Sequence, residues 1–135
     1  MEDCIFCKII KGELPSFKIY ESDDVVSFLT IAPMNEGHAL VVPKKHYENL
    51  FDTPEDLLAE IISDEKKLSI TIKGSLNSDG INIVQNNGVS AGQEIMHYHL
   101  HIIPRYEGDG LKPWHGIQKT PDEIRLVAEK IKSAL

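Results

Sequence analysis

Three histidines that alternate with apolar residues constrain this chain more than any other feature of its sequence. They occur at steps of two within residues 92–105: His97, His99 and His101. The residues between and after them suit a protein core: Tyr98, Leu100 and Ile102. Successive side chains of a β-strand point to opposite faces, so the histidines would share one face, roughly 6.5–7 Å apart. A helix would scatter them around its circumference. The stretch is therefore predicted to be a strand whose polar face performs nucleophilic, proton-transfer or metal chemistry.

Length and composition fit a single globular domain, residues 1–135, with a core of its own. No apolar run approaches the ~20 residues of a membrane span, so no membrane partner is expected. The first residues, Met1-Glu2-Asp3, are acidic where a signal peptide would be basic, which favours a cytoplasmic protein. The net charge of −7 disfavours binding to nucleic acid, but it permits a small phosphate ligand in a locally positive pocket.

The only two cysteines, Cys4 and Cys7, form a Cys-x-x-Cys pattern. In a cytoplasmic chain this pattern indicates a metal half-site or a redox pair before it indicates a structural disulfide. A redox pair usually follows a strand in a βαβ unit, whereas this pair opens the chain. A zinc site would need two further ligands from elsewhere in the sequence.

Apolar spacing and turn residues predict the remaining short elements. Strands are expected at residues 17–21, 24–29, 39–43 and 81–86, and a short helix at 4–11. The connections between neighbouring strands are of hairpin length, which favours an antiparallel arrangement. Together with the histidine strand, the pattern predicts an α+β domain, in which an antiparallel sheet of about five strands is flanked by helices.

Two longer helices have recognisable beginnings. Thr53, followed by Pro-Glu-Asp, predicts a helix capped by Thr53 that runs to about Lys73. Thr120, followed by Pro-Asp-Glu, predicts a capping box and a final helix that runs to near the C-terminus. Three connecting segments are expected to be irregular: residues 74–80, 87–92 and 104–119.

Four stretches resemble the histidine triad (HIT) family. His-x-His-x-His, preceded by Gly-Gln, resembles the family signature. Residues 4–15 look like its N-terminal segment, residues 37–46 like its central strand and following turn, and residues 86–93 like its phosphate loop. The resemblance covers a core of roughly residues 3–105, while residues 106–135 correspond to the part that varies between branches.

The resemblance implies a HIT-like fold that pairs into a homodimer. It also implies a nucleotide hydrolase that attacks an α-phosphate and forms a covalent nucleotidyl-histidine. The implied substrates are nucleoside phosphoramidates, adenylates or dinucleoside polyphosphates. A purine nucleotide or one of these derivatives is therefore the expected partner.

The resemblance also suggests roles for the histidines and the amides. His99, the middle histidine, would be the nucleophile. His101 would donate a hydrogen bond to the α-phosphate, and His38 would orient or buffer the nucleophile. Gln93 and Asn86 match positions whose amides contact the bridging atom or the phosphate oxygens.

The nucleoside would contact apolar residues that match the family's base pocket: Phe6, Ile9, Phe28 and Ile31. Phe6, Ile9 and Phe28 fit an ordinary core equally well. Thr30 stands where many relatives have an aspartate for the ribose, so ribose binding would differ. Glu94 stands where the phosphoramidase branch often has a serine that assists the leaving group. This glutamate would either donate a proton or point to solvent.

His97 is the first histidine of the triad and so a catalytic candidate, but it also has a second candidate role. Relatives with the same Cys-x-x-Cys bind zinc through a Cys2His2 set, which here would be Cys4, Cys7, His46 and His97. Two thiolates and two imidazoles suit tetrahedral Zn²⁺. Such a closed site would be structural and would not be needed for the chemistry.

Two other functions are compatible with the sequence. One is a metallohydrolase in which the histidines hold a catalytic metal, although three neighbours on a straight strand span too far to reach one ion at ~2.1 Å. Alternatively, the chain is a nucleotide-binding regulator with little turnover. The substrate, the base preference and any contact of Trp114 or His115 with the site are not determined by the sequence.

Overall fold

A five-stranded antiparallel sheet forms the centre of the domain. The computed structural model describes residues 3–135, so Met1 and Glu2 of the acidic N-terminal stretch lie outside it. The strands lie in the order β1-β2-β3-β5-β4. Their bounds are Phe17–Glu21 (β1), Val25–Leu29 (β2), Ala39–Pro43 (β3), Gly80–Gln85 (β4) and Leu100–Arg105 (β5). The predicted α+β class and the five antiparallel strands are confirmed.

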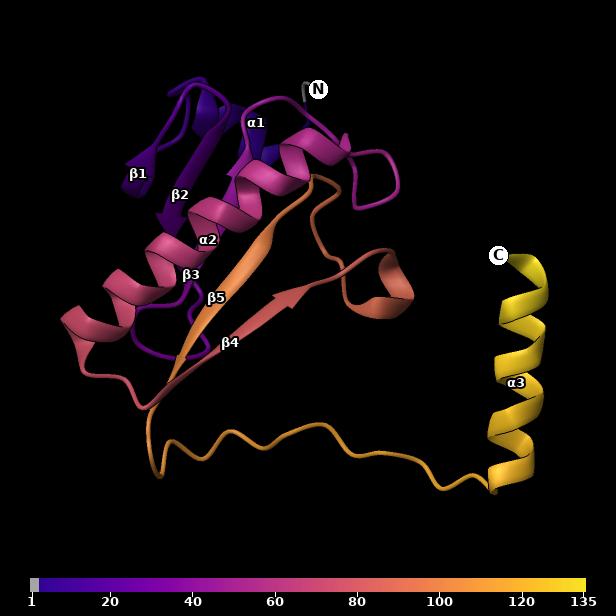
Figure 1. The fold of residues 1–135 in the computed structure, drawn as a ribbon. Helices are drawn as coiled ribbons and strands as arrows, with labels where there is room; N and C mark the ends of the chain where they lie inside the picture. The colour runs from indigo at the N-terminus through magenta and orange to yellow at the C-terminus, as the bar shows by residue number, and fades with distance from the viewer. Residues whose placement is uncertain (1–2) are drawn as a thin grey trace.

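The helix α2 (Glu55–Leu76) covers one face of this sheet (Figure 1). The core on this side holds residues from alternate strand positions, among them Val25, Val41, Leu100 and Ile102, together with Ile61 and Leu68 of α2. Tyr98 also belongs to it and is 3% exposed. The predicted core face of the histidine stretch is therefore confirmed.

The short helix α1 (Ile5–Ile10) covers part of the opposite face. Its Phe6 packs against residues of β2 and β3: Val26, Phe28, Leu40 and Val42. Leu40 pairs with His101 in β5, and Val84 of β4 pairs with the same histidine. Paired residues of antiparallel strands share a face, so His101 lies on the α1 side. The remaining part of this face, formed by β5 and β4, is therefore where a functional site can form.

The strand β5 begins later than the sequence predicts. It starts at Leu100, so His97 and His99 precede it. The physical reason lies in the partner strand, because Pro43 ends β3 and has no N–H to continue the ladder. The N–H of Tyr98 instead donates to the carbonyl of Tyr47 at 2.7 Å. Alternation nevertheless continues, and the rings of His99 and His101 are 4.9 Å apart between centroids.

The boundaries of α2 also differ from the prediction. Pro54 occupies the N-cap position, and the hydroxyl of Thr53 donates to the carbonyl of Asn49 at 2.6 Å. Thr53 is therefore not the cap. The helix includes Gly74 and ends at Leu76, and its C-cap Asn77 adopts a left-handed conformation with φ of 52°. The link to β4 is consequently only residues 77–79.

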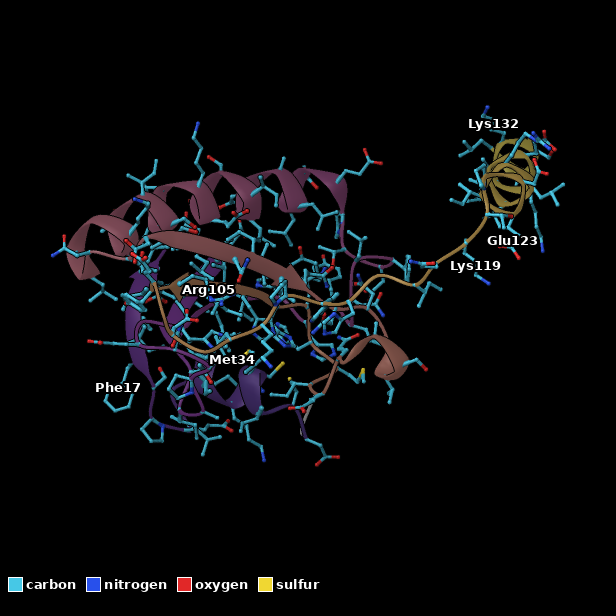
Figure 2. All side chains as sticks on the ribbon, turned by 90° about the horizontal axis from the view of Figure 1, so that it is seen from below. Phe17, Met34, Arg105, Lys119, Glu123 and Lys132 are labelled. Carbon is cyan, nitrogen blue, oxygen red and sulfur yellow. The ribbon has the colours of Figure 1, made fainter. Side chains whose placement is uncertain are left out.

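The chain after β5 leaves the sheet. Residues 106–120 contain no helix or strand, whereas Pro104 and Arg105, which were predicted to be irregular, belong to β5 because they pair with β4. The final helix α3 (Pro121–Ala134) has the predicted capping box between Thr120 and Glu123. It stands apart from the sheet and from α2 in both views (Figure 1, Figure 2), and none of its residues is buried.

A short 3₁₀ helix, η1 (Val89–Ala91), lies in the loop that precedes the histidines. Of the helices in residues 3–135, none is long and apolar enough to span a membrane.

Replacing Ile61 by alanine should lower the free energy of unfolding by roughly 2–5 kcal/mol, because it leaves a cavity between α2 and the sheet. Ile61 is fully buried, whereas its neighbour Ile62 is 51% exposed. Ile62→Ala removes the same atoms from the same helix, so it is the matched control and should cost less than about 0.5 kcal/mol. Chemical denaturation measures both values. Equal losses would contradict this assignment of the core.

Candidate active site and metal centre

A cavity of about 1350 Å³ lies on the open face of the sheet. His38, His99 and His101 are among the residues that line it. One part of its wall is apolar, with Phe6, Ile9, Phe28 and Ile31. Another part is polar, with Asn82, Gln85, Asn86 and Glu94. A single space thus brings together most of the residues predicted to bind substrate.

The ring of His99 is held in one neutral tautomer by the backbone carbonyl of His97. Its Nδ1 lies 2.8 Å from the carbonyl oxygen of His97. A ring nitrogen that faces a carbonyl must carry the proton, which leaves the lone pair on Nε2. Burial lowers the pKa of His99, opposed by this hydrogen bond and by the negative charge of Glu94. The geometry therefore provides a neutral imidazole with an available lone pair, as a nucleophile requires.

His38 contacts His101 and not His99, which corrects the predicted role of His38. The N–H of Met34 donates to Nδ1 of His38 at 3.1 Å, so the proton of His38 must be on Nε2. This Nε2–H lies 2.9 Å from Nδ1 of His101, which therefore accepts. The proton of His101 is then on Nε2. A backbone amide thus sets the tautomer of His101 through His38.

His38 and His101 are neutral mainly because both are buried. Burial lowers the pKa of His38. Burial, followed by the charges of His99 and His38, lowers the pKa of His101 to about 4. At neutral pH, His101 is therefore an uncharged imidazole whose Nε2–H is available as a hydrogen-bond donor.

Gln93 does not line the cavity, contrary to the role expected for it. Its side chain is buried, and its Nε2 donates to the carbonyls of Glu48 and Ile95 at 2.6 and 3.2 Å. Its Oε1 accepts from the N–H of Gly88 at 2.8 Å. The amide thus holds the loop before the histidines in place. Asn86 does line the cavity, as expected.

The sequence left open whether the apolar residues Phe6, Ile9 and Phe28 belong to the core or to a base pocket, and the structure gives Phe6 and Phe28 both positions. Phe6 and Phe28 are 4% and 3% exposed and pack edge to face at 5.6 Å, so they belong to the core. They also line the cavity, together with Ile9, Thr30 and Ile31. The hydroxyl of Thr30 accepts from the N–H of Ala32 at 3.2 Å. Trp114 borders the cavity, whereas His115 is not among its lining residues.

Several lining residues were not found from the sequence. Asn82, Val84 and Ile103 border the cavity because β4 pairs with β5 in the register that aligns Val84 with His101. Alternation within β4 identifies which residues share a face. Which strand lies beside the histidines is visible only in the folded sheet.

Cys4, Cys7, His46 and His97 meet beside the cavity. One ligand atom from each lies within 4.8 Å of all the others. Nδ1 of His97 is 3.4 and 3.5 Å from the sulfurs of Cys4 and Cys7, and 3.1 Å from Nδ1 of His46. A tetrahedral zinc with two sulfur and two nitrogen ligands has ligand–ligand distances of about 3.3–3.8 Å. The donor set and its spacing therefore fit zinc.

His97 belongs to this cluster and not to the cavity. It is fully buried, and its Nε2–H donates to the carbonyl of Pro43 at 2.8 Å, which directs the lone pair of Nδ1 toward the cysteines. Burial lowers the pKa of His97 to about 4, so its imidazole is neutral. Both ring nitrogens point away from His99. The arrangement does not support one metal held by all three histidines, nor a direct catalytic role for His97.

Comparison with known proteins gives consistent results. The family model described as the HIT domain matches residues 11–108. An uncharacterized HIT-like protein of Methanocaldococcus jannaschii is 56% identical over 126 residues, which cover 93% of this chain and 97% of that protein. An adenosine 5′-monophosphoramidase of Candida albicans is 42% identical over 138 positions, covering 98% and 91% of the two chains.

One of the similar solved structures is of a zinc-bound protein. The crystal structure of a Zn-bound histidine triad family protein from Mycobacterium smegmatis has a TM-score of 0.78 and 33% identity, and 99% of each chain is covered. On the histidine stretch, the fold and these matches, the chain belongs to the HIT domain family.

Proposed function

We propose that this protein hydrolyses nucleotide derivatives at the α-phosphate through a covalent nucleotidyl-histidine. The observation that carries the proposal is the tautomer of His99, whose Nδ1–H is held by the carbonyl of His97 while Nε2 keeps its lone pair at the cavity. The similarity to an adenosine 5′-monophosphoramidase supports the same class of reaction.

In the first step, Nε2 of His99 attacks phosphorus and the bond to the leaving group breaks. Nε2–H of His101 donates to a phosphate oxygen, which stabilises the charge that develops there. In the second step, water displaces the histidine and releases the nucleoside monophosphate. The apolar wall formed by Phe6, Ile9, Phe28 and Ile31 would hold a purine base, and Asn86 would contact the phosphate.

Mixing the wild-type protein with adenosine 5′-phosphoramidate should give a transient adenylyl adduct on His99. His99→Ala should lose the adduct and lower kcat at least about 10³-fold, because the nucleophile is gone. His101→Ala keeps the nucleophile, so it should still form the adduct while kcat falls about 10²–10³-fold. Rapid-quench mass spectrometry with peptide mapping measures both. Turnover by His99→Ala at the wild-type rate would contradict the mechanism.

We further propose that Cys4, Cys7, His46 and His97 hold one structural zinc ion. Zinc would supply no chemistry to the phosphate and would fix the segment that begins α1 against the residues that precede β5. The distances among the four ligand atoms support the proposal. The Zn-bound relative from Mycobacterium smegmatis supports it independently.

Protein purified without chelators should contain about one zinc ion per chain, and Cys4→Ser should contain far less, because a thiolate ligand is lost. His101→Ala also removes a histidine from this face of the sheet, but from outside the cluster, so it should keep its zinc. Metal analysis by mass spectrometry and thermal unfolding of both variants test this expectation. A metal-free wild type would count against the site.

We also propose that two copies form a homodimer. The helix α3 exposes one apolar face, to which Ile124, Val127 and Ile131 contribute, and none of these residues is buried in its own domain. A helix of 14 residues is marginally stable in water on its own. A second copy of the chain would cover this face and stabilise the helix.

Light scattering coupled to gel filtration should give twice the chain mass of 15.2 kDa. Val127→Glu places a charge on the apolar face of α3 and should weaken the dimer. Ser133→Glu adds the same charge about 180° around the helix from Ile124, so it is the matched control and should leave the mass unchanged. A monomeric wild type would contradict the proposal.

A further inference from the structure

Glu94 is the only acidic residue among the described residues that line the cavity. Its side chain is exposed, and within residues 3–135 its carboxylate forms no ion pair or hydrogen bond. An exposed carboxylate is ionised at neutral pH. Glu94 and His99 line the same cavity, and both lie in the stretch that leads into β5. An unpaired negative charge therefore lies in the cavity that contains the proposed nucleophile.

The positive residues of the cavity do not cancel this charge. Arg105 donates to both carboxylate oxygens of Asp109 at 2.8 and 3.0 Å, to Oδ1 of Asn82 at 2.7 Å and to the carbonyl of Leu111 at 2.7 Å. Its guanidinium is thus already paired. Lys112 also lines the cavity but lies on the exposed segment that follows β5. His38 and His101 are neutral, because burial lowers the pKa of each.

Glu94 lines the cavity together with the polar residues at the end of β4, Gln85 and Asn86. The apolar wall would be filled by the nucleoside, which leaves the polar wall at the end of β4 for the other half of the substrate. The carbonyl of Gly92, two residues before Glu94, accepts from the amide of Asn86 at 3.4 Å, which anchors this stretch beside β4. The carboxylate and the leaving group would then share one side of the phosphate.

We infer that Glu94 selects substrates whose leaving group is an amine over substrates whose leaving group is an anion. The inference rests on the proposed function. The protein would then hydrolyse nucleoside phosphoramidates efficiently and dinucleoside polyphosphates poorly. The reason is the sign of the charge that develops on the departing atom.

In a phosphoramidate, Nε2 of His99 forms a bond to phosphorus as the P–N bond breaks. The nitrogen keeps the bonding electron pair, takes a proton from solvent and departs as an amine. Positive charge develops on this nitrogen as it is protonated, and the carboxylate of Glu94 stabilises it. In an anhydride the P–O bond breaks and the oxygen departs with negative charge, which the same carboxylate repels.

The test compares kcat/KM for two substrates, an adenosine 5′-phosphoramidate of a simple alkylamine and diadenosine tetraphosphate. Glu94→Gln keeps the shape of the side chain and removes its charge. The ratio of the two values, phosphoramidate over polyphosphate, should fall at least about tenfold in this variant. Added salt should lower the ratio in the wild type but have little effect on it in Glu94→Gln, because salt screens an exposed charge.

Glu107→Gln is the matched control. Glu107 is exposed and does not line the cavity, so this variant changes the net charge equally and should keep the wild-type ratio. A ratio in Glu94→Gln within twofold of the wild type would overturn the inference. Equal losses for both substrates would overturn it too, since Glu94 would then act on the nucleophile or the fold.

Failure of the inference can be told from failure of the proposed function. If the ratio does not change but an adduct still forms on His99, the covalent mechanism stands and only the selectivity is wrong. If neither substrate gives an adduct on His99, both are wrong.

Discussion

The pairing of β3 with β5 is the constraint on which the rest of the structure depends. Leu40 lies opposite His101, and Val41 lies opposite Leu100. A slip of one residue would turn Leu100 and Ile102 to the open face and bury the histidines against α2. The apolar residues prevent that slip, because both are almost fully buried in the core under α2. Hydrophobic burial on one face thus fixes the position of the polar chemistry on the other.

His97 joins this sheet to both proposed sites. Its Nδ1 faces the cysteines, its Nε2–H donates to Pro43, and its carbonyl accepts from His99. Both ring nitrogens and the carbonyl of His97 therefore have partners at the same time. Because His97 belongs to the Cys2His2 cluster and its carbonyl holds the ring of His99, a metal bound by the cluster would also fix the backbone that orients His99. The two proposed sites would have different functions, but the geometry of both depends on the position of His97.

The sequence predicts those features that depend on local periodicity or local caps. Alternation identified the core side of the histidine stretch, and the Thr120 capping box formed as expected. The resemblance predicted the Cys2His2 set, whose members the fold brings together. Errors arose where a distant partner decides the outcome. Gln93 turns inward because Glu48 offers a carbonyl, and His38 contacts His101 across 63 positions of sequence. Neither partner can be read from the spacing of nearby residues, and the late start of β5 depends on Pro43 in another strand.

The electrostatics of the cavity differ from those of many phosphate sites. Its histidines are neutral, and its one arginine is paired with Asp109. Lys112 lies on the exposed segment after β5, and Glu94 adds a negative charge to the cavity. On the proposed mechanism, stabilisation of the transition state would therefore come mainly from oriented hydrogen bonds such as Nε2–H of His101, and less from positive charge. Such a site would bind a highly charged polyphosphate poorly, because little positive charge would compensate its loss of hydration. It would suit a substrate with one negative charge at phosphorus, whose leaving group departs without a further negative charge.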